Sequence, residues 1–225
     1  MRSLLETENL SFAYREGEWI LKDVNLSLAR GEIIGVMGLS GSGKSTLCYC
    51  LGGIIPHVYP GILSGQVFLE GTAVRDLKLF QIAQKLGILF QNAETQLFSS
   101  TLEEDVVFGP ENLCWSWQEM DNSLQASLAV TGMTEFRFRH PKTLSGGQGQ
   151  LAALSATLAL NPMTLLFDEA MSQLDPKGVS AVQDCALGLS KQGRGLILVE
   201  HDPEHLRIAN RLFVLEAGSL KETAL

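Results

Sequence analysis

The chain contains 225 residues, of which 45% are hydrophobic and 19% charged, and its formal net charge is −8. This length suits one large domain or two small ones, and the apolar content supports a sizeable core, which excludes an intrinsically disordered chain. The acidic charge argues against a general nucleic-acid-binding protein, but it leaves nucleotide binding open, because backbone amides and one lysine can hold phosphates.

The cysteines and the apolar runs indicate in which cellular compartment the protein works. The chain has four cysteines: Cys48, Cys50, Cys114 and Cys185. The first two would point to different faces of one helix and the others are isolated, so we interpret all four as buried free thiols rather than as metal ligands or disulfides. The start of the chain lacks a signal-peptide pattern, and no apolar run reaches the roughly 18 residues of a transmembrane helix. We expect a cytosolic protein that meets a membrane only through a partner.

The chain opens with apolar residues at every second position. They form two groups: Leu10, Phe12 and Tyr14, then Val24, Leu26 and Leu28. This period of two predicts half-buried antiparallel strands. The continuous apolar run at 33–37 instead predicts a strand covered on both faces, and a helix is expected from 44 to about 51.

Beyond this helix, strands and helices alternate around one helical insertion. First come a loop over 52–65, a strand over 66–69, a helix over 77–86 and a strand over 87–90. From 91 to 145 the apolar spacing becomes helical, as at Leu124 and Leu128, which indicates a helical subdomain inserted into the core. Then come a helix to 159, a strand over 164–167, a helix over 177–191, and strands over 196–199 and 211–215. This alternation predicts a mostly parallel sheet in an α/β fold.

A glycine-rich loop lies between the strand at 33–37 and the helix at 44. Its pattern, Gly38-x-x-x-x-Gly43-Lys44-Ser45, is typical of a loop that holds the phosphates of a nucleoside triphosphate. Glycines let the backbone approach phosphate oxygens, and the helix N-terminus adds partial positive charge. We expect Lys44 to reach the β- and γ-phosphates and Ser45 to ligate Mg²⁺. The predicted ATP-binding residues of this loop are Gly38, Ser40, Gly41, Ser42, Gly43, Lys44, Ser45 and Thr46.

Two carboxylates end a buried strand. The apolar run Leu165-Leu166-Phe167 leads into Asp168 and Glu169. An apolar strand that ends in acids is ordinary by itself. Beside a phosphate loop, it indicates that Asp168 holds Mg²⁺ and that Glu169 polarises the attacking water.

The segment Leu144-Ser145-Gly146-Gly147-Gln148 precedes this strand and opens a predicted helix. Its hydroxyl and glycine amides would form a second anion site at a helix N-terminus. With this LSGGQ segment ahead of the two carboxylates, nearly the whole chain resembles the ATP-binding cassette (ABC) ATPases. The resemblance implies a P-loop NTPase fold with an N-terminal antiparallel β subdomain and an inserted α-helical subdomain. It implies one nucleotide-binding domain over 1–225, with its core at 1–90 and 146–225 and the Q-loop and helical subdomain at 91–145.

The resemblance also implies roles for individual residues. The residues expected to face the ATP of a second subunit are Ser145, Gly146, Gly147 and Gln148, together with Asp175 in the D-loop Ser172-Gln173-Leu174-Asp175. Two chains arranged head to tail would then complete two ATP sites. Gln91 matches the Q-loop glutamine that senses Mg²⁺ and water, and His201 matches the switch histidine that contacts the γ-phosphate. Tyr14 is the ring expected to stack on adenine.

The passage between Gln91 and Asn112 points to one branch of the family. It reads QNAETQLF at 91–98 and VFGPEN at 107–112, and it is similar to the ATPases of energy-coupling factor (ECF) transporters, which import vitamins and transition-metal ions such as cobalt or nickel. The resemblance implies an ATP-hydrolysing subunit on the cytoplasmic face of a membrane, with ATP and Mg²⁺ as cofactors. It implies a second ABC ATPase, identical or different, a transmembrane coupling subunit and a small substrate-binding membrane subunit as partners, and no nucleic acid. Another ABC importer and a soluble, non-transport ABC ATPase remain the alternatives.

Within the same passage we expect a groove for short helices of the membrane subunit. The expected apolar anchors and acidic rim residues are Leu97, Phe98 and Phe108, and Glu94, Glu103 and Glu104.

The sequence departs from the common family pattern in three places. Gly149-Gln150-Leu151 stands where basic residues usually flank the glutamine, and Ala170-Met171 stands where proline and a hydroxyl residue are usual. Neither change removes a phosphate or metal ligand, but both raise the prospect of one unequal half of a heterodimer. The chain also ends at Leu225, where the family commonly continues with a dimerising segment, so a truncation and one half of a fused pair both stay open.

Overall fold

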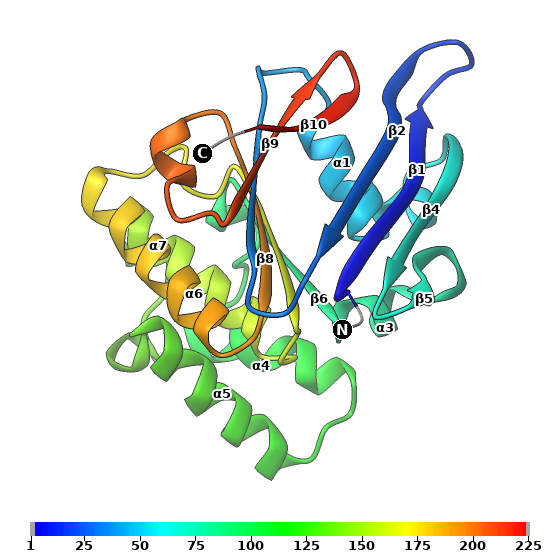
Figure 1. The fold of residues 1–225 in the computed structure, drawn as a ribbon. Coiled ribbons are helices and arrows are strands. Elements are labelled where there is room, and N and C mark those ends of the chain that lie inside the picture. Colours follow the sequence, from blue (N-terminus) through cyan, green and yellow to red (C-terminus); the bar gives the residue numbers. More distant parts are fainter. Residues whose placement is uncertain (1–2, 224–225) are drawn as a thin grey trace.

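The computed structural model describes residues 3–223, which form two β-sheets and a layer of helices (Figure 1). The larger sheet has the strand order β10-β9-β3-β8-β7-β6, and all its neighbouring strands are parallel except β9 and β10. Its strands are β3 (Ile33–Met37), β6 (Leu86–Phe90), β7 (Thr164–Asp168), β8 (Gly195–Glu200), β9 (Arg211–Glu216) and β10 (Ser219–Thr223).

The smaller sheet is antiparallel and has the order β2-β1-β4-β5. Its strands are β1 (Leu5–Ala13), β2 (Trp19–Leu28), β4 (Ile62–Leu69) and β5 (Thr72–Ala73). The apolar alternation of the first thirty residues therefore does form antiparallel strands, because one face of this sheet packs on the core.

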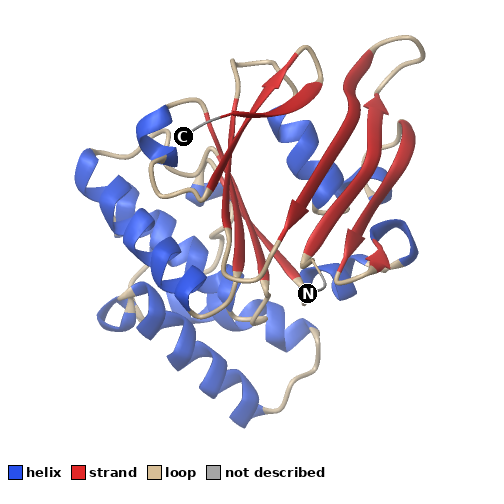
Figure 2. Ribbon diagram, viewed as in Figure 1, coloured by secondary structure: helices blue, strands red, loops and turns tan. Residues whose placement is uncertain are grey.

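Helices cover both faces of the larger sheet. The α-helices are α1 (Lys44–Leu51), α2 (Ile54–His57), α3 (Leu79–Ala83), α4 (Leu102–Asn112), α5 (Trp117–Thr131), α6 (Gly146–Leu158) and α7 (Pro176–Lys191). Short 3₁₀ turns are η1 (Val74–Asp76), η2 (Ala93–Thr95), η3 (Thr134–Phe136), η4 (Pro141–Thr143) and η5 (Pro203–Leu206). Figure 2 shows α1 between the two sheets and the longer helices on the other side of the larger sheet.

The hydrophobic core falls into two clusters on the two faces of the larger sheet. Ile197 and Val199 of β8 belong to the cluster that also holds Leu47 of α1 and Phe12 of β1. The intervening Leu198 belongs to the cluster formed with α4 to α7. Because successive side chains of a strand point to opposite faces, one wholly buried strand serves both clusters, which explains its unbroken apolar run.

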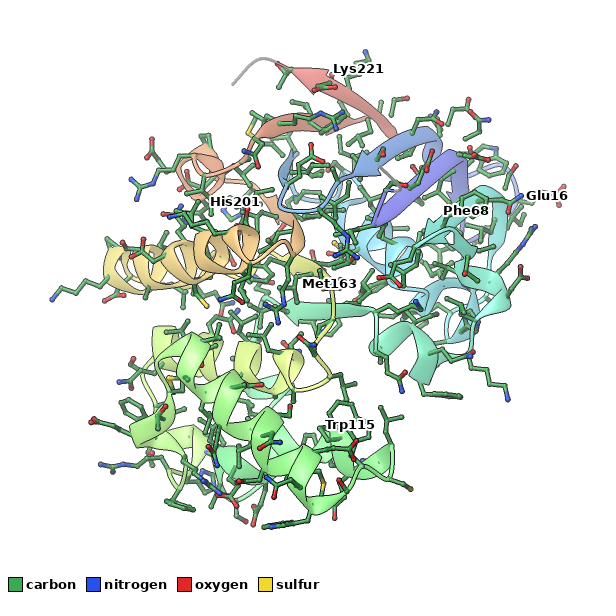
Figure 3. All side chains as sticks on the ribbon, turned by 60° about the horizontal axis from the view of Figure 1, so that its bottom comes forward. Glu16, Phe68, Trp115, Met163, His201 and Lys221 are labelled. Atoms are coloured by element: carbon green, nitrogen blue, oxygen red, sulfur yellow. The ribbon has the colours of Figure 1, made fainter. Side chains whose placement is uncertain are left out.

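Sequence-coded caps define the helical subdomain. Thr101 at α4 and Ser116 at α5 each form a capping box with the glutamate three residues later, and Gly132 ends α5 with a φ of 70°. Figure 3 shows Trp115 in this helical layer, on the side of the molecule away from Lys221 of β10. No helix within residues 3–223 is both long enough and apolar enough to cross a bilayer.

Several predicted boundaries are wrong. The loop predicted over 52–65 contains α2 and the first residues of β4, and the helix predicted over 77–86 shortens to Leu79–Ala83. β10 was not predicted because it is a largely exposed edge strand without apolar alternation. Tyr14, the last residue of the first alternating group, lies just after β1 and not in a strand.

The cysteine interpretation is confirmed for Cys48 and Cys50, which are buried free thiols. It is wrong for Cys114, which is exposed, and Cys185 is only half-buried. Cys114 follows the end of α4 with a φ of 56°, in a turn that keeps its side chain outside the core.

Candidate functional site

The predicted catalytic residues gather where parallel strands of the larger sheet end. The glycine-rich loop follows β3, Gln91 follows β6, Asp168 ends β7 and His201 follows β8. Ligands of open parallel sheets bind beyond the carboxyl ends of the strands, so this edge is the expected place for a nucleotide. A cleft of about 400 Å³ opens there, lined by Ile20, Ser40, Gly41, Gly43, Lys44, Ser45, Thr46, Gln91, Asp168 and Glu169.

The phosphate loop has the backbone that its glycines allow. Gly41 and Gly43 have φ values of 79° and 102°, in the left-handed region that glycine tolerates best. Gly43 is the N-cap of α1 and provides no side-chain cap, so side chains leave the first amides of this helix without a partner. The loop therefore presents an uncapped helix N-terminus to the cleft.

Lys44 lies at the centre of the cleft although it is only 4% exposed. Its Nζ donates to the carbonyl of Gly38 at 2.9 Å and lies 3.0 Å from Oε1 of Glu169. A buried ammonium is costly unless it is paired. Two carbonyls and one carboxylate compensate for its burial here, the second carbonyl being that of Leu39.

The two carboxylates have different surroundings. Asp168 is 6% exposed and accepts a 3.3 Å hydrogen bond from Ser45 Oγ. Burial raises the pKa of Asp168, and the hydrogen bond from Ser45 works against that shift. Glu169 has a φ of 52°, and its Oε2 lies 3.8 Å from Nδ1 of His201. An uncommon backbone conformation at a site residue requires that its surroundings hold it in place.

Gln91 lines the same cleft, but its side-chain amide points toward the segment after Glu169. Its Nε2 donates to Ser172 Oγ at 3.0 Å, and Ser172 Oγ donates in turn to the carbonyl of Glu169 at 2.8 Å. The loop after β6 is thereby connected to the loop after β7 through one hydroxyl.

Tyr14 lies next to the phosphate loop. It is 47% exposed, packs edge-on against Phe12 with ring centroids 4.8 Å apart, and its hydroxyl is 3.5 Å from Thr46 Oγ1. This exposure is compatible with the stacking prediction, although Tyr14 itself does not line the cleft. Ile20, which also lines the cleft, was not singled out, because an isoleucine in a strand carries no chemical signal.

The LSGGQ segment lies outside this cleft. Ser145 is the N-cap of α6: its Oγ accepts the Gln148 N–H at 3.4 Å, and Gln148 Oε1 accepts the Ser145 N–H at 3.0 Å. A Cβ on Gly147 would come within 2.9 Å of Gly178 Cα, so the absence of a side chain lets α6 approach the start of α7. Asp175 caps α7 by accepting the Gly178 N–H at 2.8 Å, which brings both predicted partner-facing segments together.

Sequence reasoning missed two buried polar residues near the cleft. Gln150 is 1% exposed, and its Nε2 donates to the carbonyls of Phe90 at 2.8 Å and Ala170 at 2.7 Å. Glu200 is fully buried at the end of β8. A glutamine in an apolar helix and a glutamate that ends an apolar strand were the available signals.

Part of the predicted docking surface is also corrected. Leu97 is only 8% exposed and belongs to the core, so it is no surface anchor. Glu103 pairs with Arg137, and Glu104 belongs to the capping box of α4. Phe98 and Phe108 are exposed and pack edge-on with centroids 4.8 Å apart.

Several known proteins are similar to this chain in sequence and in fold. The sequence profile of the ABC transporter family matches residues 21–172. The energy-coupling factor transporter ATP-binding protein EcfA of Methanosarcina acetivorans is 39% identical over 218 residues, which cover 96% of this chain and 78% of that protein. EcfA1 of Streptococcus pneumoniae is 34% identical over 227 residues, covering 100% and 81%.

Two solved structures are similar over almost the whole chain. The structure of cbiO1 from Clostridium perfringens, described as part of the ABC transporter complex cbiONQ, has a TM-score of 0.88 at 28% identity and covers 98% of this chain and 88% of that one. The bacterial ABC transporter cassette MJ0796, described as dimeric, has a TM-score of 0.82 at 27% identity and covers 98% of both chains. These findings confirm the predicted family and fold class.

Proposed function

The chain belongs to the ABC transporter family, and from that premise we propose that it is the ATP-hydrolysing subunit of an importer of the ECF type. The observation that carries the proposal is that Lys44, Asp168 and Glu169 line one cleft, with His201 Nδ1 3.8 Å from the Glu169 carboxylate. The EcfA relatives and the cbiO1 structure support the ECF branch. The ECF resemblance implies a vitamin or a transition-metal ion such as cobalt or nickel as the cargo.

ATP would occupy the cleft with its phosphates at the N-terminus of α1. The loop residues already named, from Gly38 to Thr46, would surround the phosphates, and adenine would stack on Tyr14. The γ-phosphate would compete with Glu169 for Lys44, because the ammonium now lies 3.0 Å from that carboxylate. ATP binding would therefore free Glu169 for a role in hydrolysis.

The residues at the cleft floor suit Mg²⁺. Ser45 Oγ and Asp168 Oδ1 lie 3.3 Å apart, and Gln91 lines the same cleft, so hard oxygen ligands from three elements are available. Mg²⁺ would neutralise phosphate charge when bound. Burial raises the pKa of Asp168, and the positive charge of the ion would favour the ionised form of this carboxylate.

Two side chains would handle the attacking water and the terminal phosphate. Glu169 would polarise the water, since one oxygen faces the phosphate-binding lysine and the other faces His201. His201 is about half exposed at the end of β8, where it could donate to the γ-phosphate. Gln91 would couple the occupancy of the cleft to the loop after Glu169 through its hydrogen bond to Ser172.

A second cassette would complete each ATP site. Ser145, Gly146, Gly147, Gln148 and Asp175 lie outside the cleft of their own chain but close to one another at the starts of α6 and α7. A head-to-tail partner would bring this anion site over the bound triphosphate. MJ0796, a similar cassette, is described as dimeric.

A groove between the core and α4 would hold the membrane subunit at the cytoplasmic face. It has a volume of about 390 Å³, and its apolar lining includes Leu79, Ile82, Phe98, Phe108 and Leu160. A short amphipathic helix could bury its apolar face there. Of the predicted rim acids, Glu94 is exposed, but it lines a separate pocket with Leu97 and Ser145 rather than this groove.

We propose that residues 1–225 form one nucleotide-binding domain, with the core at 1–90 and 146–225 and the Q-loop and helical subdomain at 91–145. α6 joins the two parts, because its residues share a core cluster with α4, α5 and β7.

The test is hydrolysis and co-purification. The chain should hydrolyse ATP in the presence of Mg²⁺, and a tagged copy should retain the transmembrane coupling subunit and the small substrate-binding subunit when all are expressed together. Retention of the coupling subunit without the small one would favour another kind of ABC importer. Hydrolysis without any membrane partner would favour a soluble ABC ATPase.

A further inference from the structure

Glu200 is a fully buried carboxylate that has no role in the site described above. It is the last residue of β8 and directly precedes His201. A buried carboxylate costs several kcal/mol unless hydrogen bonds or charges compensate it. Its partners therefore indicate what it holds in place.

Those partners come from the loop that follows β7 and from the turn that follows β8. Oε1 of Glu200 accepts the Met171 N–H at 2.9 Å, and Met171 lies two residues after Glu169. Oε2 lies 3.3 Å from Nδ1 of His205, in the η5 turn that follows His201. The carboxylate thus joins the loop after β7 to the turn after β8.

The η5 end of this connection is itself anchored. Gln183 of α7, which is 2% exposed, donates from Nε2 to the carbonyls of Glu204 at 3.0 Å and His205 at 3.2 Å. His205 is therefore held from its backbone as well as from its ring. The other end of this network is the loop that begins at Glu169.

That loop carries the group that would activate water. The Glu169 N–H donates to Val199 O at 2.8 Å, and Glu169 keeps a φ of 52°. The hydrogen bond from Met171 to Glu200 fixes the chain two residues later. An unfavourable backbone conformation persists when neighbours determine it from several sides, and Glu200 supplies one of those sides.

We propose that Glu200 is a positioning residue for ATP hydrolysis: by accepting the Met171 N–H while paired with His205, it holds the Glu169 loop in register with His201. This proposal rests on the proposed ATPase function and assigns no contact with ATP to Glu200. Catalytic geometry is sensitive to displacements of about 1 Å, which can cost up to roughly 100-fold in rate.

The test compares two near-isosteric substitutions that each remove a buried acceptor from a main-chain N–H. Glu200→Met leaves the Met171 N–H without its partner. Thr7→Val does the same to the Leu26 N–H, which donates to Thr7 Oγ1 at 2.8 Å in the smaller sheet, outside the cleft. Glu200→Gln keeps an oxygen that can accept from Met171. For the full chain we would measure kcat and KM for ATP, the melting temperature, and hydrogen exchange of the peptide that contains Met171.

We expect Glu200→Met to lower kcat at least about tenfold with KM within about twofold, and to speed exchange at Met171. Glu200→Gln should return kcat to within about threefold of wild type. Thr7→Val should leave kcat within about twofold, even where its melting temperature falls as far as that of Glu200→Met.

Three results would overturn the proposal: an unchanged kcat in Glu200→Met, a Glu200→Gln protein as slow as Glu200→Met, or an equal loss of kcat in Thr7→Val. The first would show that Glu169 needs no such support. The second would assign the effect to charge rather than to the accepting oxygen, and the third to general stability. A wild-type chain without ATPase activity, both alone and with every candidate cassette, would instead refute the proposed function itself, whereas active wild-type protein with unaffected variants refutes only the role of Glu200.

Discussion

The helices α1 and α6 both begin in glycine-rich segments, yet their first turns are built differently. Gly43 at the start of α1 has a left-handed backbone and offers no side-chain cap, while Ser145 at the start of α6 forms a capping box with Gln148. The first helix has no side-chain cap, and lysine and carboxylate side chains lie together beside its start. The second satisfies amides of its own first turn through this capping box, and in the proposed two-chain site a partner's phosphate would replace the cap. Under the proposed function, one chain would contribute a cleft to one ATP site and the start of α6 to the other.

The largest expected effect tests whether ATP hydrolysis depends on Glu169, in the cleft at the start of α1. Glu169→Gln should keep ATP binding and lower kcat at least about 100-fold, roughly 2.7 kcal/mol of barrier, because the water loses its polarising carboxylate while Asp168 and Ser45 remain. Steady-state ATPase assays and nucleotide titrations measure the two quantities. Hydrolysis close to the wild-type rate would remove Glu169 from this role.

The next prediction tests whether the start of α6 contacts the ATP of a second chain rather than the ATP of its own chain. ATP should produce a dimer of the Glu169→Gln protein, with itself or with a different cassette. Adding Ser145→Arg should weaken that association about 30-fold, roughly 2 kcal/mol, with little change in ATP binding by the single chain, because α6 lies outside its own cleft. Analytical ultracentrifugation with and without ATP measures it. A monomer with ATP, alone and with every candidate cassette, would contradict the two-chain site.

A smaller effect is expected at the proposed docking groove, whose lining includes no residue from the start of α1 or of α6. Changing Phe98 and Phe108 to serine should weaken assembly with the membrane subunit about tenfold, because the exposed aromatic pair would lose its apolar contacts. ATP binding by the isolated chain should stay unchanged. Co-purification yield and nucleotide titration measure these outcomes.

Leu97→Ser is the matched control for the groove. Leu97 is buried, so this change should lower the melting temperature rather than act on assembly alone. Lost ATP binding with intact assembly in the Phe98 and Phe108 variant would identify the pair as core instead of docking surface.

The smallest effect separates the two roles of Ser145, which are to cap α6 and, as proposed, to contact a partner's ATP. Ser145→Ala should lower the free energy of unfolding by about 1 kcal/mol, and Ser116→Ala, which removes the equivalent capping box of α5, should cost a similar amount. Only the first should also reduce ATPase activity. Chemical denaturation and ATPase assays check the pair, and equal activity in both variants would reduce Ser145 to a structural cap.

Short motifs in the sequence predicted much of the fold and the residues proposed for the site. The phosphate loop, the carboxylates that end β7 and the LSGGQ segment are local patterns whose backbone requirements are written in adjacent residues. The family and the mixed sheet follow from them and are confirmed. Strands buried on both faces were also predictable, because an unbroken apolar run has few other uses.

Tertiary structure alone decided which polar and apolar residues of irregular segments turn inward. Leu97 and Phe98 are adjacent and similar in chemistry, yet one enters the core and the other stays 66% exposed. Glu200 and His201 are likewise adjacent, and only the first is buried, where it reaches Met171 from a distant part of the chain. Periodicity assigns a face only inside a regular helix or strand. At element ends and in loops, the direction of a side chain depends on which distant segment offers it a partner, and no local pattern carries that information.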